Sequence, residues 1–176
     1  MSELLINEVC YDLRNWINHS KEGHRRKEED LIYFDKLWAW AANTICYLEK
    51  KTDSHNKEKN DFLNLVRFEG TLYRVHKKYN RKAEHFGVNE TNHYVSWTKA
   101  CDVTDIYWLC DDMDFIAITA NANSKLFGID LIGLNNYIKK YYYPDYSIGS
   151  PAIIKEQEVV FPLKYSFIQN IKINRL

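Results

Sequence analysis

The chain has 176 residues, and 24 lysines and arginines balance 24 aspartates and glutamates, so the formal net charge is zero. This neutrality argues against a protein that coats nucleic acid by bulk electrostatics, because such domains usually have an isoelectric point above about 9. The content of 45% apolar and 27% charged residues is that of a globular domain and excludes a disordered tail.

The first third of the chain has a helical pattern. Between residues 27 and 51 apolar side chains recur at steps of three and four, which predicts one helix with an apolar stripe. We expect this stripe to face the core; a surface that docks a partner is the alternative. A shorter helix is expected over residues 3–19, and the polar residues 51–60 are expected to form an exposed connection. The stripe consists of Leu31, Phe34, Leu37, Trp38, Ala41, Ile45 and Leu48.

After residue 60 the chain changes to short runs rich in Tyr, Val, Ile, Thr and Phe, which are typical of strands. We expect short helices over residues 102–110 and within 128–140. Helices followed by a mainly antiparallel β region predict the α+β class. We expect a single domain over 1–176, with a helical part over 1–60 and a β-rich part over 61–176. The expected strands are 71–77, 94–98, 115–119, 159–163 and 164–173.

The cysteines and the N-terminus bear on the cellular compartment. No Cys-x-x-Cys pair and no Cys/His cluster of zinc spacing occurs, so we expect free thiols, a reducing compartment and no metal site. The first residues lack the apolar run of a signal peptide, and no apolar run approaches the roughly 18–20 residues that cross a bilayer. We therefore expect a cytoplasmic protein without membrane contact. The cysteines are Cys10, Cys46, Cys101 and Cys110.

Two expected strands carry polar side chains that suggest a site. Arg74 lies in an otherwise apolar segment, where a charge is costly unless it is paired and where the planar guanidinium can hold a phosphate. Strand alternation places Ser96 and Thr98 on one face, where two hydroxyls can order a carboxylate or a ligand ribose. The alternatives are a surface-facing arginine and an ordinary strand with polar outer positions.

A third polar feature is the pair Glu156 and Glu158, at the expected start of a strand. Two residues i and i+2 in a strand share a face, so both carboxylates are expected to lie together. Two negative charges this close repel each other. A sequence tolerates this repulsion where the two carboxylates share a task, one stabilising positive charge and the other handling a proton. The alternative is a solvated strand entrance.

The order and spacing of these polar residues resemble those of the ADP-ribosyltransferase superfamily of the Arg/Ser-Thr-Ser/Glu-x-Glu class. The matching residues are Arg74, then Ser96-Trp97-Thr98, then Glu156-Gln157-Glu158. The apolar frames at 72–76 and 158–163 are also similar, and the resemblance covers about residues 72–163. Trp97 stands where the family usually has threonine. Members of this family cleave the nicotinamide–ribose bond of NAD and transfer ADP-ribose to an acceptor, through a transition state similar to that of glycoside hydrolysis.

The resemblance implies a role for each matching residue. Glu158 is the catalytic carboxylate, which bonds the nicotinamide-ribose hydroxyl and stabilises the oxocarbenium ion. Glu156 orients or deprotonates the acceptor, and Arg74 grips a phosphate of NAD. Ser96 supports Glu158 and the ribose, and Thr98 assists. An aromatic ring usually covers the nicotinamide, and the candidates are Tyr107, Trp108 and Phe127.

The acceptor is left open by the sequence. Residues 141–151, with four tyrosines, resemble the acceptor-recognition loop of the family. Exposed rings there can clasp an arginine or stack on bases, or else the rings pack onto the domain. The Glu-x-Glu pattern usually accompanies transfer to protein arginine, whereas a smaller set of relatives, including phage-defence toxins, modifies nucleic acid. The basic run 74–82 can follow a phosphate backbone or form an ordinary solvated face, whereas the run 102–114 is acidic.

The small size and the absence of an export signal suggest an intracellular toxin or modifier, of the kind found in phage-defence toxin–antitoxin pairs, with a neutralising antitoxin as partner. Two other activities fit the same sequence features. One is a non-catalytic binding module on the same fold. The other is an NAD glycohydrolase, which releases nicotinamide without labelling an acceptor.

Overall fold

The computed structural model describes residues 11, 13–16, 28–50, 56–77, 94–103, 115–148 and 151–174. Its helices are α2 (Glu28–Lys50), α3 (Lys57–Val66), α5 (Leu131–Tyr141), α6 (Pro151–Glu156) and the 3₁₀ helix η1 (Tyr165–Phe167). Its strands are β1 (Arg67–Phe68), β2 (Gly70–Lys77), β3 (Tyr94–Thr98), β4 (Phe115–Ala122), β5 (Gly128–Asp130), β6 (Glu158–Pro162) and β7 (Ile168–Asn174).

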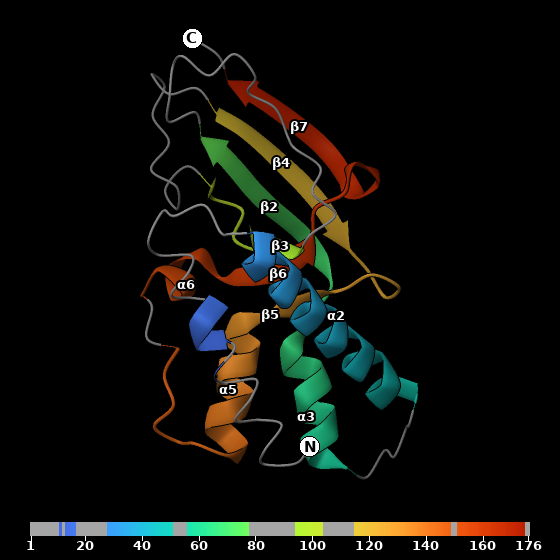
Figure 1. Cartoon of the computed structure of the whole chain (residues 1–176), viewed down its shortest axis with the longest axis vertical. Coiled ribbons are helices and arrows are strands. Elements are labelled where there is room, and N and C mark those ends of the chain that lie inside the picture. The colour runs from blue at the N-terminus through green and yellow to red at the C-terminus, as the bar shows by residue number, and fades with distance from the viewer. Residues whose placement is uncertain are drawn as a thin grey trace.

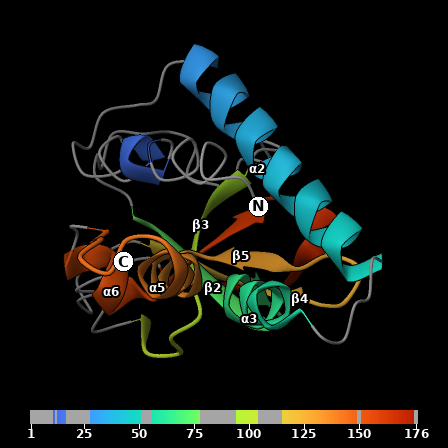
Figure 2. The same ribbon diagram turned by 90° about the horizontal axis from the view of Figure 1, so that it is seen from below.

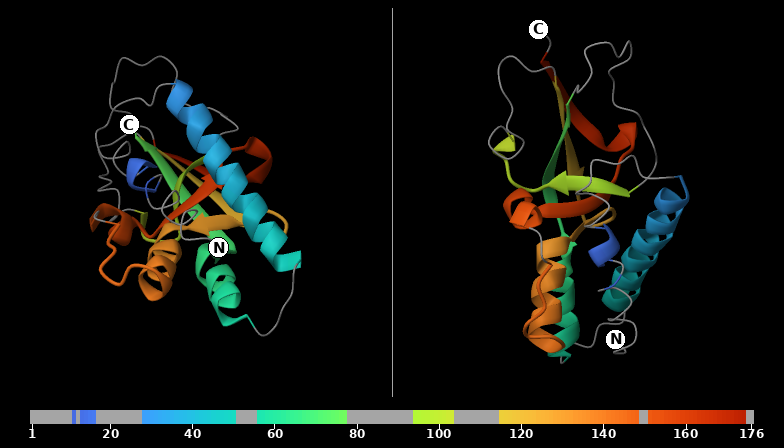
Figure 3. Two further views of the ribbon diagram at one scale, coloured as in Figure 1. Left: turned by 60° about the horizontal axis from the view of Figure 1, so that its bottom comes forward. Right: turned by 60° about the vertical axis from the view of Figure 1, so that its left-hand side comes forward.

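The strands form one seven-stranded antiparallel sheet in the order β1-β5-β6-β3-β2-β4-β7. Figure 1 shows β2, β4 and β7 as one long layer, with β3, β5 and β6 nearer the helices. Among the described residues, the single Cα pair Tyr73 and Thr98 joins β2 to β3. Figure 3 shows β3 and β6 running across the direction of β2 and β4, so the sheet curls sharply at this junction.

Each face of the sheet carries its own core. On one face α2, α3 and α5 pack over β5 and β6, and Figure 2 shows α3 and α5 side by side with α2 running obliquely past them. On the other face, residues of β2, β3, β4 and β6 pack together around Trp97. Because side chains alternate along a strand, neighbouring residues of β3 and β6 belong to different cores. This second core consists of Leu72, Trp97, Ile116, Ile118, Ala120, Ala122, Val159, Phe161 and Leu163.

The helical stripe predicted over 27–51 is confirmed as α2, and its inward positions Phe34, Trp38 and Ile45 are buried in the core. The expectation of an exposed connection over 51–60 is wrong for its last residues. Helix α3 begins at Lys57, and the side chain of Asn56 caps it by accepting a hydrogen bond from the Lys59 amide at 3.0 Å. The polar first turns of α3 hid a helix that buries only its later residues.

The strands β2, β3, β4, β6 and β7 confirm the five predicted strands to within a few residues, except that residues 165–167 form η1 before β7 begins. The short helix predicted within 128–140 is confirmed as α5, which begins at Leu131 directly after strand β5. Helix α5 follows because the carboxylate of Asp130 accepts a hydrogen bond from the Gly133 amide at 2.9 Å. The predicted helices 3–19 and 102–110 lie mostly outside the described residues.

At this level the prediction of N-terminal helices followed by a mainly antiparallel sheet is confirmed. The sheet is continuous, and its two halves meet where β2 pairs with β3. None of the helices that the structure describes has the length and apolar character that a membrane span requires.

Candidate active site

The three polar segments singled out in the sequence lie on three neighbouring strands, with β3 between β2 and β6. Thr98 is directly opposite Glu158 on β6, and Ser96 is opposite Val160. Residues directly opposite one another in an antiparallel pair point to the same face. Ser96, Thr98 and Glu158 therefore share the face that the helices cover.

Glu158 is the most deeply buried of the candidate residues that carry a charge, with 2% of its surface exposed. Its Oε1 atom accepts a hydrogen bond from the indole Nε1 of Trp16 at 2.8 Å. A buried carboxylate is strongly disfavoured unless hydrogen bonds satisfy it. Trp16, which is 142 residues away in the chain, therefore supplies a hydrogen bond that the buried Glu158 needs.

Trp16 is itself fully buried and belongs to an aromatic cluster with two residues of α2. Its ring meets Phe34 edge to face at a centroid distance of 5.1 Å and Trp38 at 5.3 Å. Arg14 lies over the ring of Tyr146 at 5.5 Å. The short N-terminal segment 13–16 is thus held against the site by several contacts. The sequence reasoning missed it because no local pattern links Trp16 to Glu158.

Glu156 does not share a strand with Glu158, so the inference that alternation puts both on one face is wrong. Glu156 is the last residue of α6, and Gln157 has a φ of 46°, in the left-handed region. This turn redirects the chain between the two carboxylates. Glu156 is only partly buried, whereas Glu158 opens β6 beneath the helices. The environments of the two groups are therefore distinct.

Thr98 fixes this turn from β3. It is fully buried, its hydroxyl donates to the backbone carbonyl of Glu156, and its Oγ1 accepts from the Ala100 amide at 3.0 Å. The Lys99 amide adds a bond to the Gln157 carbonyl at 3.4 Å. Thr98 therefore positions the backbone around the two glutamates.

The side chain of Arg74 contacts the backbone of β3. Its Nη1 donates a hydrogen bond to the carbonyl of Ser96. Because Tyr73 is opposite Thr98, alternation places Arg74 on the other face of the sheet from Glu158. The structure thus brings the strands of Arg74 and Glu158 together but does not direct the two side chains toward each other.

Of the aromatic residues proposed to cover nicotinamide, Tyr107 and Trp108 lie outside the described residues. Phe127 is buried in the helix-side core. Asp130 is opposite Val159, the neighbour of Glu158, and Phe127 lies three residues earlier, roughly 10 Å along the strand. Phe127 is therefore part of a different set of contacts.

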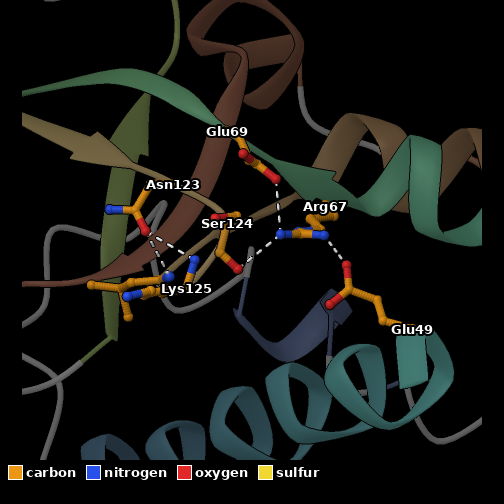
Figure 4. A network of polar contacts seen from close by, with 7 residues as sticks. Glu49, Arg67, Glu69, Asn123, Ser124 and Lys125 are labelled. Atoms are coloured by element: carbon orange, nitrogen blue, oxygen red, sulfur yellow. Dashed lines mark hydrogen bonds and ion pairs between the residues drawn. The ribbon is translucent and has the colours of Figure 1, made fainter.

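That set centres on Arg67, whose guanidinium lies over the Phe127 ring at 5.0 Å. Figure 4 shows Arg67 between Glu49 of α2, Glu69 and the Ser124 carbonyl. The Nη2 atom lies 2.8 Å from Glu69 and donates to Ser124 at 2.9 Å. Arg67 ties the end of α2 to the sheet and to the turn before β5, which is a structural role.

Another charged pair lies beside Thr98. Lys99 forms an ion pair with Asp130, the residue that caps α5. Lys99 also lies over the Phe68 ring, with 5.9 Å between Nζ and the ring centroid. The N-cap position of Asp130 before an apolar run could have been found from the sequence, whereas its pairing with Lys99 depends on the register of the strands.

The tyrosines of the segment that resembles an acceptor-recognition loop pack onto the domain. Tyr141 ends α5 and donates to Asp61 of α3, while the hydroxyl of Tyr142 donates to Glu58. Together with the hydroxyl of Tyr137, the Tyr142 hydroxyl lowers the pKa of the Glu58 carboxyl. These contacts resolve the alternative in favour of packing for the described rings.

A hollow of about 260 Å³ opens between α2 and α3, at the ends of these helices that lie away from β6 in Figure 1. Its lining includes Glu58, Lys59 and Tyr137, and no lining residue comes from β2, β3 or β6. It is therefore separate from the candidate site around Glu158.

Comparison of the chain with protein-family models, with curated proteins and with solved structures finds no match. The candidate site is therefore defined by the residues themselves and by the strand order that brings them together.

Proposed function

We propose that this protein is a mono-ADP-ribosyltransferase that uses NAD as substrate. The observation that carries the proposal is the strand order. Arg74, the Ser96–Thr98 pair and Glu158 come from distant parts of the sequence, yet they occupy the adjacent strands β2, β3 and β6. In this proposal Glu158, which is buried opposite the buried Thr98, supplies the negative charge that the reaction needs.

In the proposed reaction the bond between the nicotinamide nitrogen and the ribose C1′ breaks. The bonding electron pair goes to the ring nitrogen, so nicotinamide leaves as a neutral molecule, and positive charge develops on the ribose. The Glu158 carboxylate stabilises this charge, and the acceptor atom then forms a bond to C1′. Fixed electrostatic groups of this kind contribute rate factors of about 10² to 10³ each.

The second carboxylate acts on the acceptor. Glu156 is more exposed than Glu158 and is held by the turn that Thr98 fixes. From there it takes the proton that the acceptor group loses on attack. We expect Glu156→Gln to keep nicotinamide release and to lose most of the transfer, which would leave a glycohydrolase.

The resemblance gives Arg74 the role of gripping an NAD phosphate; because its side chain lies on the other face of the sheet from Glu158, this role stays a prediction. Its Nη1 atom donates a hydrogen bond to the Ser96 carbonyl. If this role is correct, Arg74→Lys raises KM for NAD, because lysine lacks the planar fork. If Arg74 only holds β2 to β3, Arg74→Lys should lower the free energy of unfolding and leave KM for NAD unchanged.

The acceptor is protein arginine or RNA, and the setting we propose is a cytoplasmic toxin with a neutralising antitoxin. The test incubates the protein with labelled NAD and a cell lysate and then digests the product. Label that protease releases identifies a protein acceptor, and label that nuclease releases identifies RNA or DNA. Nicotinamide release without label identifies an NAD glycohydrolase.

A non-catalytic binding module is the second candidate, and one observation favours it. Glu158 has 2% of its surface exposed and is hydrogen-bonded to Trp16, which is how a structural buried carboxylate looks. Absence of both label and free nicotinamide would support this module and contradict the transferase.

A further inference from the structure

The contact between Trp16 and Glu158 raises a question of access. A carboxylate that stabilises a substrate must touch it, yet Glu158 is covered by the indole of Trp16, which is fully buried. The N-terminal segment therefore lies where a ligand of Glu158 would have to lie. The indole of Trp16 contacts Glu158 on the face of the sheet that the helices also cover, and it comes from a segment distant in sequence.

The chemistry of the contact matches that of the proposed ligand. The indole offers one N–H donor to Oε1 of Glu158, as a ribose hydroxyl would, and a flat aromatic ring beside it, as nicotinamide would. Phe34 and Trp38 meet this ring with their own rings at nearly right angles, 84° and 88°. The space that Trp16 fills is thus a slot with aromatic walls and a carboxylate at one side.

Trp38 adds an independent observation. It is 2% exposed, and its Nε1 atom has no hydrogen-bond partner in the part of the chain that the structure describes. A buried donor of this kind is uncommon, because most buried polar groups are paired. A ligand with a hydrogen-bond acceptor would satisfy it, whereas the indole of Trp16 has only a donor.

We propose that Trp16 blocks the substrate site by occupying the place of the nicotinamide-ribose end of NAD, and that segment 13–16 must withdraw before NAD can bind. The inference rests on the proposed transferase function. It adds a closed form of the protein and assigns Phe34 and Trp38 to the ligand-binding slot. Opening is unfavourable because it breaks the bond to Glu158 and separates the rings of Trp16, Phe34 and Trp38.

The test measures nicotinamide release by the wild type and by Trp16→Phe. The substitution keeps an aromatic ring and removes the N–H donor, so the closed form loses a hydrogen bond to a buried charge. If the closed form dominates in the wild type, losing this hydrogen bond raises the population of the open form. We therefore expect kcat/KM for NAD to rise by about tenfold or more. The matched control is Trp40→Phe, a change at the exposed face of α2, which should leave kcat/KM unchanged.

The outcomes separate the inference from the function on which it rests. Release by the wild type that does not rise in Trp16→Phe would overturn the closed form and leave the transferase standing. Absence of release from both proteins would overturn the transferase and, with it, the inference. If Trp16→Phe does not fold, the test instead follows the NMR signal of the Trp16 indole N–H in the wild type. NAD must then shift this signal and speed its exchange with water, and an unchanged signal under turnover contradicts the inference.

Discussion

Thr98 gives a sharp test of how the site is held. Replacing it by valine keeps the shape of the side chain and removes the hydroxyl that bonds the Glu156 carbonyl and the Ala100 amide. A buried group left without its partner costs about 1–3 kcal/mol, and both partners here are only partly buried, so water replaces part of each bond. We expect Thr98→Val to lower the free energy of unfolding by about 2 kcal/mol.

Thr119 on β4 is the matched control, because its hydroxyl is buried and has no hydrogen-bond partner among the described residues. The same change to valine removes an unsatisfied polar atom, so we expect stability to stay unchanged or to rise by up to about 1 kcal/mol. Urea unfolding measures both variants, with an unchanged dependence on urea as the sign that only stability has changed. In thermal unfolding Thr98→Val should lower Tm by about 4–8 °C.

Equal stability of Thr98→Val and the wild type, or equal losses in the two variants, would refute this account of the turn. If Thr98→Val keeps full stability but loses activity, Thr98 contacts a ligand, as the resemblance alone implies. The structure assigns it the backbone role instead, because none of its surface is exposed.

The remaining predictions concern helix packing and pH. An added Cβ at Gly133 would lie 1.6 Å from the Leu65 carbonyl oxygen, so Gly133→Ala should lower the free energy of unfolding by about 2 kcal/mol in urea, although helix propensity alone predicts a gain of about 1 kcal/mol. The hydroxyls of Tyr142 and Tyr137 lower the pKa of Glu58 below 4.5, so their stabilisation is present above that pH and is lost as pH falls through the lowered pKa. Tyr142→Phe should therefore reduce stability at pH 7 and have almost no effect near pH 2 in urea titrations, and an equal effect at both pH values would contradict this assignment.

The elements that the sequence predicted well are those whose apolar pattern matches their burial. Helix α2 buries one stripe with helical spacing, and β3 has the same bounds as the strand predicted over 94–98. Helix α3 was missed because Lys57 to Asp61 is polar and only Phe62 and Val66 are buried. A short helix with two buried residues gives too weak a period to be seen.

The candidate site shows a different limit. Strand order brought the predicted segments together, and no local pattern gives the two features that define the site most closely. One is the left-handed turn at Gln157, which a residue other than glycine rarely adopts and which separates Glu156 from Glu158. The other is the bond from Trp16, which depends on packing across 142 residues of sequence.

The most direct test of the transferase proposal is nicotinamide release from NAD by Glu158→Gln. Glutamine keeps an oxygen that can accept the Trp16 bond, so the variant should fold normally. It removes the negative charge, so release should fall at least about a hundredfold. The measurement is made with and without Trp16→Phe, so that a blocked site does not hide the activity. Release at the rate of the matched protein that retains Glu158 would contradict the proposal, as would the absence of release from every protein tested.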